Sequence, residues 1–273
     1  MTIKPLSAFV CLLLVPGLVF AQDATSLVPV ACRTSSDQLK TPPPPDRPAV
    51  SAEKIDSTGR STSGFFSIPE PPNYSIAQMR IADYADCIDP NHCYWSDLAK
   101  QTTLAQSKLK ELIEKHKGES NLAMVLDIDD TSLTSYCEEK REGFGFYYPI
   151  NEAWMTSTEA SIPIPGTLAL YQQAVKANLE VFFITGRNHE DYVTTSRNLI
   201  KAGYTDFKPD HLILRDDAER TMTATQYKSL ERDKITAQHY KIILSVGDQW
   251  SDLNGTSVAE VSIKLPNPFY FLF

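Results

Sequence analysis

From residue 123 onward, short apolar runs alternate with longer segments in which apolar residues recur every three or four positions. The apolar runs predict five buried strands, over residues 123–128, 181–185, 211–215, 241–248 and 261–266. The longer segments predict amphipathic helices over residues 166–178, 189–203 and 225–239. Because strands that alternate with helices pair in parallel and are covered on both faces, the pattern predicts a three-layer α/β domain.

Two more helices are predicted before the first strand, as an N-terminal helical extension. One is expected to begin near Ser75, because Ser75 and Gln78 have the S-x-x-Q spacing of a capping box. The other is expected over residues 98–117, where an apolar stripe has helical spacing and Gly118 follows the last turn. His116 lies at the flank of that stripe, which favours a packing role over a ligand role.

Residues 1–21 have the pattern of a cleaved signal peptide. Lys4 precedes an apolar run over residues 6–20, and Ala21 is a small residue at the cleavage point. A membrane anchor is the alternative, but the run is short for a membrane span and a Pro-Gly pair interrupts it. The mature protein is therefore expected to be exported, to the periplasm or outside the cell, without stable membrane insertion.

Residues 22–73 are rich in proline, as in TPPPPDRPAVS, and predict an extended or flexible segment without a chemical role. Residues 74–273 then form the folded domain. The formal charge is −8, and it becomes −9 when Lys4 leaves with the signal peptide. An acidic chain is poorly suited to a nucleic acid polymer or an anionic membrane, so a phosphorylated substrate would need local positive groups or a metal ion. The composition leaves the oligomeric state open.

Four cysteines remain after removal of the signal peptide: Cys32, Cys87, Cys93 and Cys137. An even number in an oxidising compartment permits disulfides in three pairings, and the spacings do not fit a zinc site. Cys87 and Cys93 flank a five-residue loop that can close a bridge, which would leave Cys32 and Cys137 as the second pair. The alternative is that Cys32 stays free in the proline-rich segment.

Three carboxylates follow the first predicted strand in the stretch VLDIDDTSL, at Asp127, Asp129 and Asp130. Unpaired like charges at the end of a buried strand are costly, so the position calls for a function. Residues two apart on an extended chain point to the same side, so Asp127 and Asp129 would face one point if the strand conformation continued. Ligands of parallel α/β sheets bind outside this edge of the sheet.

Other polar groups follow the second and fourth predicted strands, at the same edge. The second strand ends in TGR, with the hydroxyl of Thr185 and the accessible backbone of Gly186; the fourth ends in GDQWSD, with Asp248 and Asp252. Lys228 lies on the helix before the fourth strand, where Lys234 is a second candidate. Several carboxylates at one point require a cation, and hard oxygen ligands suit Mg²⁺. A metal ion with a lysine and backbone amides suits a phosphoryl group.

The ordered set DIDDT, ITGR, a helix-borne lysine and GDQWSD resembles the four motifs of the haloacid-dehalogenase superfamily. With YKS before GDQWSDL and KLPNPFY after it, the chain is more closely similar to the acid phosphatases of subfamily IIIB. That group includes plant acid phosphatases, plant vegetative storage proteins and bacterial secreted or lipoprotein acid phosphatases. The resemblance covers about residues 74–273. It implies a Rossmann-like parallel sheet, a small helical cap insert at about residues 134–162, and a Mg²⁺-dependent phosphomonoesterase.

The resemblance also implies a role for each matching position in the first two motifs. Asp127 matches the nucleophile that becomes an aspartyl phosphate, and it is also a Mg²⁺ ligand. Asp129 matches the general acid, and its backbone carbonyl is a Mg²⁺ ligand. Thr185 and the amide of Gly186 match the groups that hold the phosphoryl oxygens.

The remaining matches concern charge. Lys228 matches the lysine that steadies the nucleophile and the phosphoryl group. Asp248 matches a Mg²⁺ ligand, and Asp252 matches an acid that supports the metal site. Covalent catalysis with electrostatic stabilisation of the transferred group agrees with this set of residues.

Two alternatives share the fold. Some storage-protein relatives lack the nucleophilic aspartate, so retention of Asp127 disfavours a purely storage or binding role. A phosphotransferase would share every motif and would differ only in the acceptor. The expected insert is dense in aromatic residues, which form either a local core or a surface that stacks on an aromatic leaving group such as a nucleoside or an aryl group: Phe144, Phe146, Tyr147, Tyr148 and Trp154.

Overall fold

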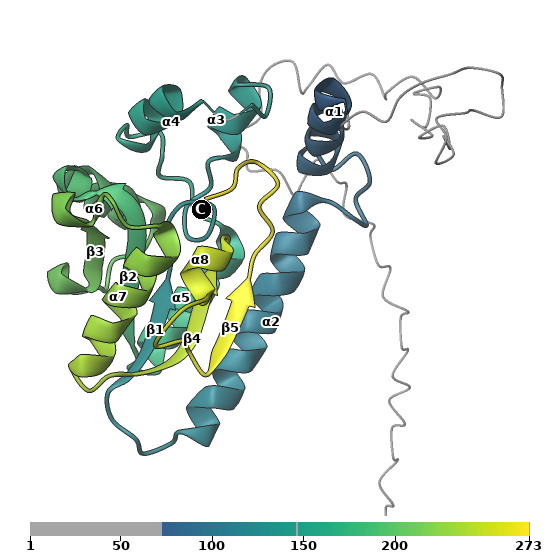
Figure 1. Cartoon of the computed structure of the whole chain (residues 1–273). Coiled ribbons are helices and arrows are strands. Elements are labelled where there is room, and N and C mark those ends of the chain that lie inside the picture. The colour runs from purple at the N-terminus through teal and green to yellow at the C-terminus, as the bar shows by residue number, and fades with distance from the viewer. Residues whose placement is uncertain (1–72, 146, 273) are drawn as a thin grey trace, which may run out of the picture.

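The computed structural model describes residues 73–145 and 147–272. Its centre is a parallel five-stranded sheet in the order β3-β2-β1-β4-β5 (Figure 1). The strands are β1 (Leu122–Leu126), β2 (Glu180–Asn188), β3 (Leu212–Arg215), β4 (Lys241–Gly247) and β5 (Val261–Lys264). The predicted parallel α/β sheet is therefore confirmed, including its fifth strand. The predicted signal peptide lies outside the described residues, as does the proline-rich segment up to residue 72.

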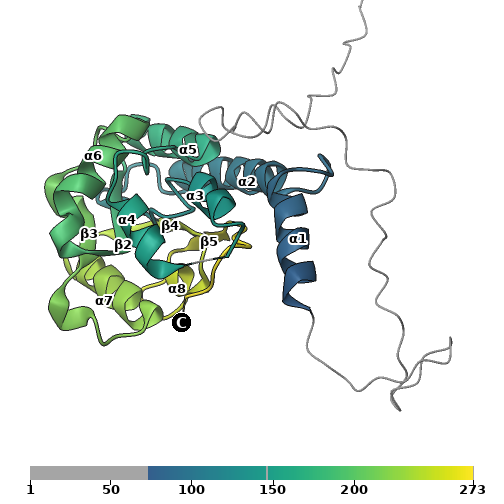
Figure 2. The same cartoon turned by 90° about the horizontal axis from the view of Figure 1, so that it is seen from above.

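Helices cover both faces of the sheet. Figure 2 shows α2, α5 and α6 on one side of the strands and α7 on the other. The helices of these layers are α2 (Tyr94–Lys115), α5 (Pro165–Lys176), α6 (Tyr192–Ala202) and α7 (Ala224–Ala237). The connections contain four shorter helical segments: η4 (His189–Asp191), η5 (Pro209–His211), η6 (Asp217–Glu219) and α8 (Trp250–Leu253).

Alternate residues of β1 pack against opposite layers. Met124 and Leu126 belong to the larger core cluster, which also contains residues of α2 and α5. Ala123 and Val125 belong to the smaller cluster, with Tyr227 of α7. Because both faces of the strand are buried, its sequence is continuously apolar rather than alternating.

The N-terminal extension begins differently from the prediction. Helix α1 (Tyr74–Ala85) is capped by Asn73, whose side chain accepts hydrogen bonds from the N–H groups of Ser75 and Ile76. Ser75 is therefore inside the helix, and the predicted capping box at Ser75 is wrong. Asparagine is as good an N-cap as serine, and here it stands two residues earlier.

Helix α2 begins four residues earlier than predicted, at Tyr94. The Oγ of Ser96 accepts a hydrogen bond from the N–H of Cys93 at 3.2 Å, which satisfies one backbone donor at this end. Cys93 is joined to Cys87 by a disulfide, as predicted, so the bridge fixes the chain just before the helix. Cys137 is disulfide-bonded as well; Cys32, its expected partner, lies outside the described residues.

Two short helices lie in the expected cap insert, α3 (Tyr136–Arg141) and α4 (Tyr148–Met155). They lie above the edge where the strands end (Figure 1). The ring of Phe144, between them, stacks on Phe269 of the C-terminal segment with ring centres 5.8 Å apart. Phe144 is thus part of a local core. Within the described part of the chain, no helix is long and apolar enough to cross a membrane.

Candidate active site

The strand β1 ends at Leu126, and Asp127 follows it into a buried position between β1 and α7. Its Oδ1 lies 2.5 Å from the Nζ of Lys228, which also contacts Oδ1 of Asp252 at 3.0 Å. The same Nζ donates to the backbone carbonyl of Ile184 in β2. Lys228 lies in the second turn of α7 and is 5% exposed, so its charge is balanced by two carboxylates and not by water.

The other lysine of this helix lies elsewhere. The side chain of Lys234 is half exposed, and its Nζ pairs with Glu219 and Glu231. The geometry therefore selects Lys228 as the lysine beside Asp127.

Three carboxylates form a cluster at the ends of β1 and β4. Asp127, Asp248 and Asp252 are buried, and one oxygen of each lies within 4.8 Å of the others. Burial, together with the negative charges of Asp252 and Asp130, raises the pKa of Asp248 to about 7. Burial also raises the pKa of Asp127, while the positive charge of Lys228 opposes that shift. Buried like charges of this kind fit a bound cation, because a divalent ion would neutralise them.

Neutral donors orient Asp248 within this cluster. Oδ1 accepts a hydrogen bond from the hydroxyl of Thr131 at 3.0 Å, and Oδ2 accepts from the amides of Gln249 and Asn267, each at 2.7 Å. Asn267 belongs to the KLPNPFY stretch, so that motif reaches the site directly. An all-oxygen set of buried carboxylates with fixed orientation suits Mg²⁺ better than a soft metal.

Close packing beneath the cluster explains the glycine of the GD pair. A Cβ at Gly247 would overlap the side chain of Asp252. Asp252 in turn accepts a hydrogen bond from the N–H of Gln249 at 2.9 Å, at the start of the short helix α8. The turn after β4 can therefore place Asp248 and Asp252 together only with a glycine at 247.

The carboxylate of Asp129 is not part of this cluster, although it lines the same cavity as Asp127 and Asp248. The chain leaves the strand conformation at Asp127, so the two-residue alternation does not extend to Asp129. Instead, Asp129 pairs with Arg187, whose Nη2 lies 2.7 Å from Oδ1 and whose Nε donates to both oxygens. The position of the side chain does not bear on the backbone carbonyl of Asp129, which stays a predicted Mg²⁺ ligand.

Arg187 is itself held by three partners, of which Asp129 is one. It is buried, and Nη1 donates to the backbone carbonyl of Met155 at 3.1 Å and to the hydroxyl of Thr195 at 3.4 Å. Met155 ends helix α4 of the cap, and Thr195 lies in α6. Arg187 was part of the TGR motif, but the sequence alone did not indicate its partner.

The third carboxylate of VLDIDDTSL turns inward. Asp130 is fully buried with a positive φ of 54°. Its two oxygens accept hydrogen bonds from the N–H of Ser135 at 2.9 Å and the hydroxyl of Ser135 at 2.5 Å. Asp130 therefore holds the loop that leads into α3 and does not reach the cavity.

The TGR segment forms the last residues of β2. Thr185 is fully buried, and its Oγ1 accepts a hydrogen bond from the N–H of Arg187 at 3.2 Å. Gly186 lines the cavity, and a Cβ at this position would meet no heavy atom within 4 Å. Its backbone is thus open to a ligand, whereas the contact of Thr185 with a phosphoryl group stays a prediction.

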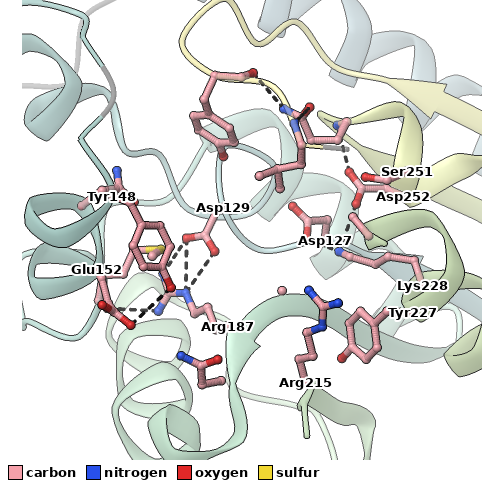
Figure 3. Close-up of a pocket in the computed structure, with 18 of the residues that line it drawn as sticks. Asp127, Asp129, Tyr148, Glu152, Arg187, Arg215, Tyr227, Lys228, Ser251 and Asp252 are labelled. Carbon is pink, nitrogen blue, oxygen red and sulfur yellow. Dashed lines mark hydrogen bonds and ion pairs between the residues drawn. The ribbon is translucent and has the colours of Figure 1, made fainter. Parts of the chain in front are cut away.

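These groups surround a cavity of about 550 Å³ between the strand ends and the cap. Figure 3 shows Asp127 and Lys228 on one side of it, and Asp129 with Arg187 on the side nearer to Tyr148. Tyr148 lines the cavity and is 54% exposed, but Trp154 is buried and lines a different hollow, beside Cys137. The structure therefore does not place Trp154 where it could stack on a leaving group, and Phe146 lies outside the described residues.

Comparison with known proteins gives the same fold. The structure is similar to a class C acid phosphatase from Bacillus anthracis with tungstate bound, with a TM-score of 0.58 and 20% identity over 72% of this chain and 86% of that chain. At this level of identity the likeness shows the fold. Residues 69–272 match the family described as HAD superfamily, subfamily IIIB (acid phosphatase), and the chain belongs to this family.

Relatives in the family include enzymes and storage proteins. The chain is 35% identical over 151 residues to acid phosphatase 1 of Solanum lycopersicum, which covers 54% of this chain and 58% of the relative. It is 32% identical over 159 residues to vegetative storage protein 1 of Arabidopsis thaliana, which covers 57% of each. The chain thus spans little more than half the length of these two relatives.

Proposed function

We propose that this protein is an exported acid phosphatase that hydrolyses phosphomonoesters through an aspartyl phosphate on Asp127, with Mg²⁺ as its cofactor. The observation that supports this most strongly is the position of Asp127. It contacts Lys228, belongs to the carboxylate cluster, and opens onto a cavity whose other wall carries Asp129. The similarity to acid phosphatase 1 of tomato agrees with this activity.

In the first step, an oxygen of Asp127 attacks phosphorus and the bond to the leaving oxygen breaks. Asp129 gives its proton to that oxygen, so the alcohol leaves neutral. Lys228 and the N–H of Gly186 stabilise the negative charge on the phosphoryl oxygens. Arg187 orients Asp129 for this proton transfer.

In the second step, Asp129 takes a proton from water while the water oxygen attacks phosphorus. The bond to Asp127 breaks and phosphate is released. A Mg²⁺ ion held by Asp127, Asp248 and the backbone carbonyl of Asp129, with Asp252 in support, would supply positive charge at the phosphoryl group. The described residues fit this ion, because the three carboxylates of the cluster are buried and the single positive charge of Lys228 does not neutralise them.

A phosphate-release assay of purified protein on a panel of phosphomonoesters, with and without EDTA, tests the proposal. Release from none of them in the presence of Mg²⁺ would instead favour a storage role, as the names of two relatives suggest. A phosphotransferase is recognised by adding an alcohol acceptor: the leaving alcohol would then exceed the free phosphate.

A further inference from the structure

Arg215 is held rigidly at the wall of the cavity. It is the last residue of β3, so it stands at the same sheet edge as Asp127. Its Nε and Nη2 donate to the backbone carbonyl of Glu219 at 3.1 and 2.9 Å, and Nη2 also donates to the carbonyl of Met222. The guanidinium carbon lies 5.5 Å from the centre of the Tyr227 ring. Backbone and ring together therefore fix the direction in which this cation points.

No carboxylate forms an ion pair with Arg215 among residues 73–145 and 147–272, and its Nη1 has no hydrogen-bond partner in that part of the chain. Other cations that line the cavity are each paired with an acid: Lys228 with Asp127, Arg187 with Asp129, and Arg220 with Glu190 and Asp217. A guanidinium cannot lose its proton in a protein. Arg215 is thus a permanent positive charge at the cavity without an acidic partner in the described structure.

The opposite part of the cavity is acidic. Glu152 of α4 and Asp191 of η4 line it, and Figure 3 shows Glu152 separated from Arg215 by the Asp129–Arg187 pair. A negative group on a bound molecule is attracted towards Arg215 and repelled by Glu152. The charges therefore favour one orientation of such a molecule.

The order of the strands determines where Arg215 lies relative to the proposed phosphoryl site at Asp127. Strand β2, with Gly186, lies between β1 and β3. Arg215 is thus one strand beyond the proposed phosphoryl site and on the side away from Asp248. That position suits contact with the leaving group.

We propose that Arg215 binds a second anionic group, a carboxylate or a phosphate, on the leaving group of the substrate. This inference rests on the proposed function, because it requires the reacting phosphoryl group to lie at Asp127. A planar guanidinium with a free nitrogen is well matched to either oxyanion. Arg215 is therefore a specificity-determining residue for phosphomonoesters that carry another negative charge.

Two substrates test the proposal, since 3-phosphoglycerate and glycerol 3-phosphate differ only in a carboxylate that replaces a hydroxymethyl group. The measured quantity is the ratio of kcat/KM for 3-phosphoglycerate to that for glycerol 3-phosphate. Arg215→Met should lower this ratio about tenfold, the value of one charge-assisted hydrogen bond in a partly solvated site. Arg215→Lys, which keeps the charge, should lower it less. Because the ratio is taken within one preparation, incomplete folding of a variant does not change it.

Arg220→Met is the matched control, because it removes an equal charge from the segment that follows β3, where Glu190 and Asp217 already pair with that charge. Its ratio should stay within about twofold of the intact protein, which would exclude an effect of net charge alone. An unchanged ratio in Arg215→Met overturns the proposal, and equal losses on both substrates would mean that Arg215 contacts only the transferred phosphoryl group. Failure of the proposed function is distinct, since the intact protein would then release no phosphate from either compound.

Discussion

The ammonium group of Lys228 lies between Asp127 and Asp252, at 2.5 and 3.0 Å from one oxygen of each. All three side chains are buried. Loss of one partner from such a group leaves the others charged and without solvent, and this is far more costly than loss of a surface pair. The arrangement ties the stability of the domain to the same residues that the proposed chemistry needs.

Replacement of Lys228 with methionine should therefore lower the free energy of unfolding by about 3 kcal/mol and turnover by at least about a hundredfold. Denaturant unfolding and a p-nitrophenyl phosphate assay measure the two effects. Lys234→Met is the control on the same helix, and it should lower the free energy of unfolding less than Lys228→Met does and leave turnover unchanged, because that lysine is half exposed and does not contact Asp127. Equal effects of the two substitutions would contradict the assignment.

Asp127→Asn should remove nearly all phosphatase activity while the protein stays folded. The substitution keeps the shape of the side chain and removes a buried negative charge, but an amide does not form the phosphoryl intermediate. Asp130→Ala is the comparison within the same motif. It should lower stability by about 1–3 kcal/mol, because the N–H and hydroxyl of Ser135 lose their acceptor. Wild-type turnover in Asp127→Asn would show that the covalent route is wrong.

Removal of divalent ions should abolish activity, and Mg²⁺ should restore it. The ion should also raise the melting temperature, since it binds the folded cluster and not the unfolded chain. Asp248→Asn should weaken both responses, so that more Mg²⁺ is needed for the same rise. Full turnover after exhaustive chelation, measured across a range of pH, would contradict a requirement for a metal ion.

Glu139 should make the protein less stable as the pH rises. Burial, together with the negative charges of Asp130, Glu142 and Glu138, raises the pKa of this carboxyl to about 8. The folded state then keeps a proton that the unfolded state releases above about pH 4.5, so the free energy of unfolding falls between about pH 4.5 and 8. Glu139→Gln should reduce this fall by about 1–3 kcal/mol. Melting curves at pH 5 and pH 8 test it; the same slope in both proteins would exclude Glu139 as the cause.

Tyr148, and not Trp154, should select aromatic leaving groups. Tyr148→Ala should lower kcat/KM for nucleoside monophosphates and aryl phosphates about tenfold more than for glycerol phosphate, because stacking of a base on an aromatic ring contributes about 1–3 kcal/mol. Trp154→Ala should instead lower stability, by about 3 kcal/mol, and affect both substrates equally. A selective loss in Trp154→Ala would reverse this assignment.

The sheet was predictable from sequence because each strand is a short apolar run bounded by turns, and both faces are buried. The helix starts were less predictable. Asn73 and Ser75 are equally suitable N-cap residues by type, and only the hydrogen bonds of the Asn73 side chain show which of them begins α1. The start of α2 depends on the disulfide at Cys93, whose effect on the local chain is not visible in an apolar stripe.

The candidate site was predictable where it depends on motifs and not where it depends on long side chains. Asp127, Lys228, Asp248 and Asp252 meet as the order of the strands requires. The position of the Asp129 carboxylate could not be derived, because it depends on where the strand ends and on an arginine 58 residues away. The uncompensated charge of Arg215 likewise follows only from knowing which acids do not reach it.

The guanidinium of Arg187 joins Asp129 to the last carbonyl of helix α4 in the cap. A substrate too bulky for the cavity would displace α4 and remove one of the three anchors that hold this arginine. The proton donor would then lose its alignment even though the phosphoryl group was bound. Size selection in such a site acts on the rate of bond breaking as well as on affinity, so poor substrates of large volume would behave as slow substrates and as inhibitors of smaller ones.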